Sequence, residues 1–120
     1  MREPEVEAKV RSYLTGKGYE VLERAQMFGV DILAKKDDKT LAIEVKGDRP
    51  GHESSPGTIN VDGMTLLGQL LLRKGMGVAD EYAVAIRPVH TRLITKAIPA
   101  LRELRVKVFL VGDESLDEIA

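Results

Sequence analysis

Two strand-like segments joined by a short charged turn limit the fold of this 120-residue chain more than any other feature of its sequence. The first is Gly-Val-Asp-Ile-Leu-Ala-Lys at 29–35, and the second is Leu-Ala-Ile-Glu-Val-Lys at 41–46. Both are rich in aliphatic residues, and the turn between them is too short for the crossover that a parallel pair requires. We therefore expect an antiparallel hairpin.

The register of this hairpin decides which side chains meet. A turn centred between Asp37 and Asp38 places Asp31 directly opposite Glu44 on the neighbouring strand. Because side chains alternate along a strand, Glu44 and Lys46 project from the same face of the sheet. This register predicts that two carboxylates and one amine gather at one place.

The rest of the chain alternates between segments of helical and strand-like periodicity. Pro99 is expected to kink or divide the last helix, because proline cannot donate a backbone hydrogen bond. The expected elements are a helix from Pro4 to the glycine cluster at 16–18, strands at 19–24, 29–35 and 41–46, a helix at 61–74, a strand at 81–87, a helix at 91–105 and a strand at 106–111.

This order, α-β-β-β-α-β-α-β, predicts an α/β fold in which helices flank a mixed β-sheet. The first three strands should form an antiparallel meander, and the last two a parallel pair with a right-handed crossover. The length fits a single domain over 1–120 with one core. The segment 47–60 is rich in Gly, Pro and Ser, and we expect a flexible loop there. The acidic tail at 113–118 is expected to be a solvated final turn.

The composition excludes several classes of protein. Cysteine is absent, which excludes disulfides, thiolate nucleophiles and zinc–thiolate sites. No apolar run approaches the length of a membrane span, and residues 1–5 do not resemble a signal peptide, so we expect a cytoplasmic location. The formal net charge of −1 argues against extensive phosphate contacts, although a whole-chain sum does not reveal a local cationic patch.

The pair of facing acids carries the chemical interpretation. Two carboxylates side by side are destabilising unless a positive charge lies between them. Hard oxygen ligands suit Mg²⁺, which binds one or two carboxylates together with waters and substrate phosphate. Such an ion polarises a phosphodiester and lowers the pKa of a bound water, while a neighbouring lysine orients that water. The convergence of Asp31, Glu44 and Lys46 therefore predicts phosphodiester hydrolysis.

The motif Gly-Val-Asp at 29–31, followed by Ile-Glu-Val-Lys-Gly at 43–47, resembles the signature of the PD-(D/E)xK nuclease superfamily. This superfamily includes restriction endonucleases, archaeal Holliday-junction resolvases and type IV restriction nucleases, and its common core is α-β-β-β-α-β. The resemblance implies a restriction-endonuclease-like core over nearly the whole chain. Val30 stands in place of the proline that names the motif.

The resemblance also implies a role for each residue. Asp31, Glu44 and the backbone carbonyl of Val45 would bind Mg²⁺, with Mn²⁺ as a substitute. Lys46 would activate the attacking water, and Glu7 in the first helix would be an outer ligand. The implied activity is that of a metal-dependent hydrolase, an endonuclease more than an exonuclease, which cuts DNA or structured nucleic acid.

Each of these assignments has a plainer alternative. Asp31, Glu44 and Lys46 would otherwise form a solvated ion-pair cluster, worth about 1 kcal/mol or less per pair. Glu7 would otherwise be a solvated glutamate that the dipole of the first helical turn favours. The alternative function is a catalytically inactive nucleic-acid-binding or assembly module on the nuclease fold.

Four further residues are candidates for contact with nucleic acid: Arg49 and His52 in the loop, and Gln69 and Arg73 in the second helix. Exposure to solvent without a function is the alternative for each of them. The second helix is also apolar around much of its circumference, including Leu72 off the main apolar face. This pattern favours a homodimer with one active site for each strand of a duplex.

Overall fold

The computed structural model describes residues 1–22, 29–52 and 55–120. Within them the chain forms three α-helices and six strands, with a short 3₁₀ turn (Pro88–His90) before the last helix. In chain order they are α1 (Glu3–Gly16), β1 (Glu20–Val21), β2 (Ile32–Lys36), β3 (Lys39–Val45), α2 (Pro56–Met76), β4 (Glu81–Ile86), α3 (Thr91–Glu103), β5 (Val106–Val111) and β6 (Leu116–Glu118).

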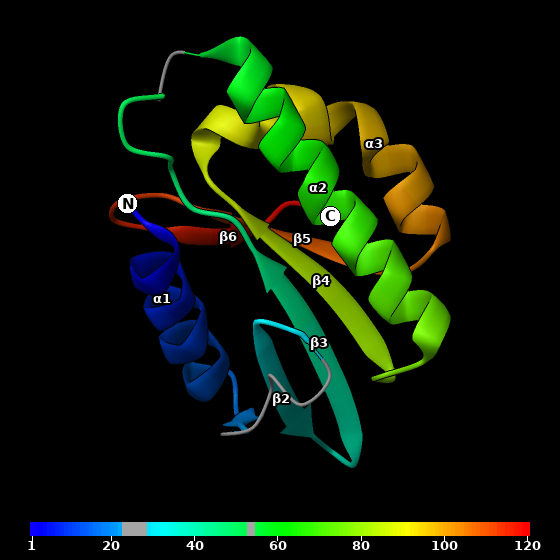
Figure 1. Cartoon of the computed structure of the whole chain (residues 1–120). Coiled ribbons are helices and arrows are strands. Elements are labelled where there is room, and N and C mark those ends of the chain that lie inside the picture. Colours follow the sequence, from blue (N-terminus) through cyan, green and yellow to red (C-terminus); the bar gives the residue numbers. More distant parts are fainter. Residues whose placement is uncertain (23–28, 53–54) are drawn as a thin grey trace.

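The six strands form one sheet in which the spatial order follows the chain. Strands β1, β2 and β3 are antiparallel, β3, β4 and β5 are parallel, and β6 is antiparallel to β5. Figure 1 shows α1 on one face of the sheet and α2 and α3 on the other. The predicted mixed sheet flanked by helices is confirmed, and so are the antiparallel meander and the parallel pair of β4 and β5.

The register of the β2–β3 hairpin is the predicted one. Ile32 pairs with Ile43, and Lys36 pairs with Lys39. The two turn residues between them, Asp37 and Asp38, both have positive φ angles, of 52° and 65°. Two left-handed residues in a two-residue turn match the right-handed twist of the flanking strands, which favours this pairing over its neighbours.

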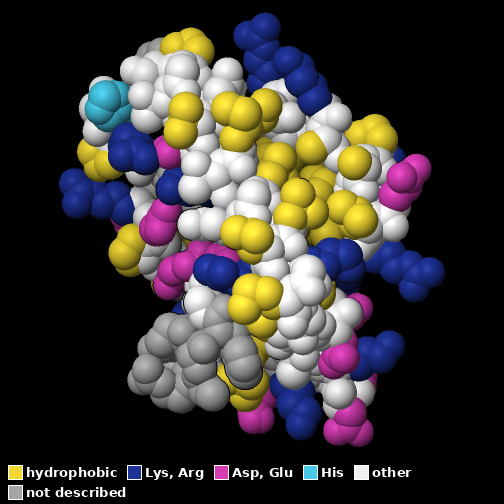
Figure 2. All heavy atoms as spheres, turned by 45° about the vertical axis from the view of Figure 1, so that its right-hand side comes forward, with side chains coloured by type: hydrophobic (Ala, Val, Ile, Leu, Met, Phe, Trp, Pro, Cys, Tyr) yellow, Lys and Arg dark blue, Asp and Glu magenta, His cyan; other side chains and the backbone are white. Residues whose placement is uncertain are grey.

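The helix α2 has one buried and one exposed apolar side. Its buried side contributes Leu66 and Leu70 to the core. Figure 2 shows hydrophobic side chains gathered on the molecular surface over α2 and α3. On α2 the large exposed hydrophobic residues are Val61, Met64, Leu71, Leu72 and Met76.

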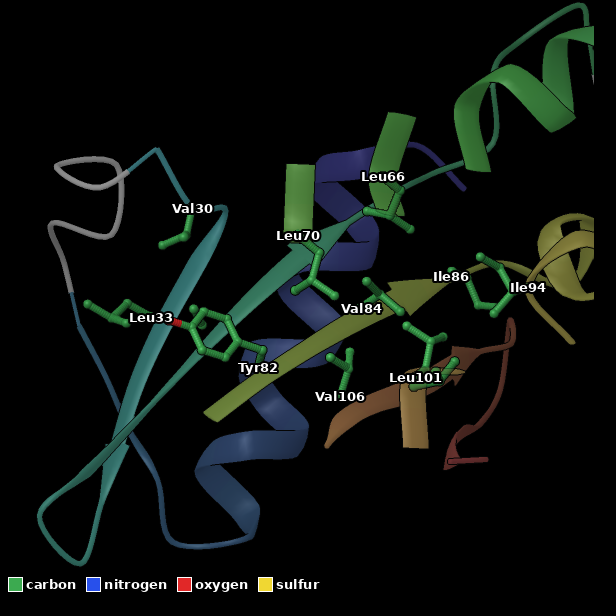
Figure 3. Packing of buried hydrophobic residues seen from close by; sticks show 12 residues of the cluster. Val30, Leu33, Leu66, Leu70, Tyr82, Val84, Ile86, Ile94, Leu101 and Val106 are labelled. Carbon is green, nitrogen blue, oxygen red and sulfur yellow. The ribbon is translucent and has the colours of Figure 1, made fainter. Parts of the chain in front are cut away.

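Alternation along the strands builds two apolar layers, one on each face of the sheet. Under α1, its residues Val6, Val10 and Leu14 pack at helical spacing on the sheet. Figure 3 shows the other layer, between the sheet and the helices α2 and α3. That layer contains Leu33, Leu66, Leu70, Tyr82, Val84, Ile86, Ile94, Leu101, Val106 and Val108.

The predicted loop at 47–60 is wrong at its end, because α2 already begins at Pro56. Proline suits the first helical position, where its missing N–H has no partner to lose, and Ser55 precedes it in an extended conformation. The first predicted strand is also shorter than expected, since β1 is Glu20–Val21. Residues 23–24 of that strand and 53–54 of the loop lie outside the described residues. Flexibility of the loop stays a prediction.

The predicted final turn at 113–118 is largely exposed as expected, but it is not a turn throughout, because residues Leu116–Glu118 form β6 and add a strand to the predicted order. Leu116 packs against the layer under α1, and Gly112 donates its N–H to the Ser115 carbonyl at 2.8 Å, which reverses the chain.

Pro99 does not divide α3. It is exposed, as is Thr95 one turn earlier, so water can satisfy the unpaired Thr95 carbonyl.

Among the described residues, no helix is both long and apolar enough to cross a membrane. A cytoplasmic location stays a prediction.

The close contact between Gly47 and the start of α1 gives a test of the packing. A Cβ at Gly47 would lie 2.3 Å from the backbone nitrogen of Glu3, so Gly47→Ala should destabilise the fold by about 1–3 kcal/mol. The matched control is Gly75→Ala on α2, where a Cβ meets nothing within 4 Å and alanine should stabilise the helix by about 0.5–1 kcal/mol. Urea-induced unfolding measures both, and equal stability of the two variants would contradict the packing.

Candidate functional site

The two acids of the predicted site meet at the end of the β2–β3 hairpin. Asp31 lies just before β2, and Glu44 is the next-to-last residue of β3. An Asp31 carboxylate oxygen (Oδ2) accepts the backbone N–H of Val45 at 2.8 Å. In this register Val45 faces Val30, so the Asp31 side chain takes a hydrogen bond that the strand backbone would otherwise accept. The bond explains why β2 starts at Ile32 and not at the predicted residue 29, and it holds Asp31 beside β3.

Glu44 is a buried acid with an unusual proton affinity. The residue is 2% exposed. Burial raises its pKa to about 8, and both a hydrogen bond with Asp31 and the charge of Asp31 act in the same direction. The charge of Arg73 and the close approach of its guanidinium to the carboxylate act in the opposite direction. Because its pKa is about 8, Glu44 keeps its proton at neutral pH, so the pair avoids carrying two negative charges there.

One oxygen of Glu44 is left without a hydrogen bond. Glu44 Oε1 is buried and has no hydrogen-bond partner among the described residues. Arg73 Nε lies 3.2 Å from it, an ion pair that lacks the alignment of a hydrogen bond. A buried carboxylate oxygen without a hydrogen bond is costly, and such an atom often marks the place of an ion or water.

Lys46 directly follows β3 and pairs with acids other than Asp31 and Glu44. Its ammonium group lies 3.2 Å from a Glu3 carboxylate oxygen and 3.9 Å from one of Asp62. Among the described residues, the ion pairs of Lys46 within 4.0 Å include neither Asp31 nor Glu44. The predicted cluster is therefore divided in this structure into an acid pair and a neighbouring lysine with its own acids.

Glu7 lies on α1, which covers the face of the sheet opposite α2 (Figure 1). It is half-buried in α1, and its pKa is raised by burial first and by the negative charge of Asp31 second. Glu3, expected to precede the helix, is instead the first residue of α1, and it reaches Lys46.

A solvent-open hollow of about 450 Å³ adjoins Lys46. The start of α1 packs so closely on Gly47 that there is no room for a side chain at this position. This contact places the start of α1 at the wall of the hollow. Three cationic side chains face the hollow, namely Arg2, Lys46 and Arg49. The remaining lining residues are Glu3, Gly47, Asp48, Pro50 and Asp62.

Sequence reasoning missed Asp62, a buried acid on α2. It accepts two hydrogen bonds from Arg49, of 3.2 Å to Nε and 2.6 Å to Nη2. Its pKa is lowered, first by these bonds and then by the charge of Lys46. A signal was present in the sequence, because Asp62 is the sole charged residue between Pro56 and Leu72. A charge in such an apolar segment often has a specific partner.

A second missed cluster lies behind the hollow. Arg87 is buried and pairs with Asp48 at 3.0 Å and Asp113 at 2.8 Å. His90 is also buried, and its Nδ1 accepts the backbone N–H of Arg87 at 3.1 Å. Burial lowers the pKa of His90, which favours its neutral form. The pairing of Arg87 with two acids far from it in sequence depends on tertiary structure, and no local pattern indicates it.

The four weaker candidates separate into two groups. Arg49 lines the hollow, and Arg73 contacts Glu44. His52 and Gln69 are exposed, and no hydrogen bond or ion pair joins either side chain to another described residue. Contact of any of the four with nucleic acid stays a prediction.

The carboxylates of Asp31 and Glu44 are ligands of the type that Mg²⁺ prefers, but they do not by themselves fill its coordination sphere. Among the described residues, no group of three or more His, Cys, Asp or Glu side chains is arranged to hold a metal. Mg²⁺ needs only one or two carboxylates, since it keeps several waters and takes substrate phosphate. The unbonded buried oxygen of Glu44 beside Asp31 satisfies that smaller requirement. The orientation of the Val45 carbonyl towards an ion stays a prediction.

No family model, curated protein or solved structure matches this chain.

The raised pKa of Glu44 predicts a specific dependence of stability on pH. Between about pH 5 and 8 the folded protein keeps a proton that the unfolded chain has released, so stability falls as pH rises. Glu44→Gln removes this loss. The free energy of unfolding of the variant should rise relative to that of the wild type by up to about 1.4 kcal/mol per pH unit in this window. Above the window the difference should stay constant.

Urea unfolding of both proteins from pH 5 to 9 without divalent metal measures the difference. Glu103→Gln, on the exposed surface of α3, controls for the general loss of a carboxylate. A difference between wild type and Glu44→Gln that stays constant with pH would show that Glu44 ionises normally.

Proposed function

We propose that this protein is a Mg²⁺-dependent nuclease of the PD-(D/E)xK type that cuts DNA or structured nucleic acid internally. The observation that carries the proposal is the Asp31–Glu44 pair with its unbonded buried oxygen, because Glu44 stands two residues before Lys46, which lines the hollow. An acid pair that raises the pKa of Glu44 to about 8 lowers stability near neutral pH, and a bound cation would offset that cost. The restriction-endonuclease-like core is part of the same proposal.

Four residues of the candidate site have separate roles in the proposed reaction. Asp31 is held by the Val45 N–H, so it offers its carboxylate in one position. Glu44 offers Oε1, and Glu7, whose pKa is raised by burial and by the charge of Asp31, would be an outer ligand that acts through an intervening water. A bound Mg²⁺ would polarise the scissile phosphate and supply an acidic water. Lys46, on the wall of the hollow, would orient that water and stabilise the charge on the phosphate oxygens.

The hollow supports a phosphodiester as the substrate. Three cations, Arg2, Lys46 and Arg49, line it together with three acids, Glu3, Asp48 and Asp62. Two of these cations, Lys46 and Arg49, are paired with Asp62, and Lys46 also with Glu3. A phosphate would compete with Glu3 and Asp62 for them, which predicts binding that weakens strongly with salt.

The pairing of Lys46 with Glu3 and Asp62 favours a second candidate function. If the lysine stays in these ion pairs, the site lacks its water-orienting group and the protein is a nucleic-acid-binding or assembly module without catalysis. Titration with Mn²⁺ separates the two functions, because an intact site binds the ion and loses it in Glu44→Ala. Absence of binding, with an oligonucleotide present as well, would favour the module.

Cleavage assays test the nuclease proposal directly. Linear, branched and single-stranded DNA are incubated with the protein with and without Mg²⁺. Asp31→Asn removes the charge of one proposed ligand, and Lys46→Ala removes the ammonium group. Each change should lower the cleavage rate by about 100-fold or more. Wild-type protein without metal should be inactive.

Two matched controls make the assay specific. Asp38→Asn keeps a residue type that tolerates the positive φ of 65° in the hairpin turn, and Lys39→Ala removes an exposed lysine at the same end of the hairpin. Both should cleave like the wild type. Equal cleavage by wild type, Asp31→Asn and Lys46→Ala would assign the activity to a contaminant and reject the proposal.

We also propose that α2 packs against α2 of a second copy of the chain. Its exposed apolar residues are between 50% and 68% accessible, and the one charged residue from Pro56 to Leu72, Asp62, is buried. Gly68 lies at the middle of this surface, where a Cβ would meet nothing within 4 Å. Met64 and Leu72 lie one helical turn to either side of it. A twofold crossing at Gly68 would therefore bring Met64 against Leu72 of the partner subunit.

Light scattering tests this interface. The wild type should have the mass of a dimer, and Leu72→Glu should be a monomer because it places a charge in the centre of the apolar contact. Leu104→Glu, which changes an exposed leucine at the end of α3, serves as the control and should stay dimeric. A monomeric wild type at working concentration rejects the interface but leaves the nuclease proposal intact.

A further inference from the structure

The guanidinium group of Arg73 joins the two parts of the chain that carry the acid pair. It donates two hydrogen bonds to the carbonyl of Gly29, of 3.2 Å from Nε and 2.9 Å from Nη2. The same Nε lies 3.2 Å from Glu44 Oε1. Gly29 stands two residues before Asp31, so one side chain from α2 contacts the segment leading to one acid and the carboxylate of the other.

The backbone around Arg73 is shaped to receive this group. Gly29 has a φ of 73°, and a Cβ there would lie 2.8 Å from Nη2 of Arg73. Glycine is therefore required at 29 both by the backbone conformation and by the guanidinium lying against it. Arg73 is itself held at the end of α2, where its carbonyl accepts hydrogen bonds from Val78 N–H and the Tyr82 hydroxyl, each at 3.4 Å. The position of the guanidinium itself is set by its contact with Gly29.

The contact with Glu44 differs from the contact with Gly29. The carbonyl of Gly29 receives two hydrogen bonds, whereas Glu44 Oε1 has an ion pair but no hydrogen bond. The guanidinium therefore stabilises the charge of Glu44 and leaves this oxygen able to accept another ligand. A divalent cation bound to Oε1 would lie close to the guanidinium, and the two positive charges would repel each other.

We propose that Arg73 is the internal counter-cation of the acid pair: it positions Glu44 before a metal binds, and a divalent cation must compete with it for Oε1. During metal binding the guanidinium keeps its two bonds to Gly29 and gives up the contact with Glu44. This inference rests on the proposed metal-dependent function. It assigns Arg73 to control of metal affinity, in place of the direct contact with nucleic acid that the sequence suggested.

Calorimetric titration of the whole protein with Mn²⁺ tests the inference without relying on cleavage. Arg73→Met keeps much of the aliphatic length and removes the competing charge, so Mn²⁺ should bind about tenfold more tightly. Arg73→Lys keeps the charge and should bind Mn²⁺ within about threefold of the wild type, since its ammonium still repels the ion. Arg102→Met, on the exposed surface of α3, is the matched control and should leave the affinity unchanged.

The outcomes separate this inference from the proposed function. Unchanged or weaker Mn²⁺ binding by Arg73→Met, with a wild type that binds, overturns the role of Arg73 and leaves the nuclease proposal standing. Binding by neither protein, with an oligonucleotide present, rejects both. If Arg73→Met fails to fold, Arg73→Gln provides the same loss of charge with donors retained for Gly29, and it should also bind more tightly than the wild type.

Discussion

The pairing of β2 with β3 is the constraint on which the candidate site depends. It fixes Asp31 opposite Glu44, and Lys46 follows directly after β3. A shift by one residue would turn Glu44 away from α2 and lose the contact with Arg73. The two left-handed residues of the hairpin turn and the apolar layers on both faces favour this register over its neighbours.

The helices α1 and α2 supply the other charged side chains of the candidate site. From one face, α1 brings Glu7 near Asp31 and Glu3 to Lys46, and Gly47 allows that close approach. From the other face, α2 contributes Asp62 at the hollow and Arg73 at the acid pair. The site therefore lies at a junction of three layers. Lys46 and Arg49 have acidic partners and Glu44 has a raised pKa, and this electrostatic balance is what a metal ion or a phosphate would change.

Several features of the fold follow from patterns that act over a few residues. Strand β5 was predicted with its observed bounds, and the two aspartates of the hairpin turn were correctly centred. The predictions for 47–60 and 113–118 were wrong because they were inferred from residue composition alone. Glycine and serine at 47–60 concealed the favourable helix start at Pro56, and the acidic residues near the C-terminus concealed a strand that Leu116 anchors to the core.

By itself the sequence determined the hairpin, its register and therefore the meeting of Asp31 and Glu44, because strand alternation and turn geometry act between near neighbours in the chain. Only the tertiary structure decided which charges surround that pair. Arg73 reaches Gly29, Lys46 pairs with Glu3 and Asp62, and these partners lie on separate elements. Contacts between distant segments depend on how whole helices pack on the sheet, and the periodicity of a segment carries no information about which residue of another it will meet.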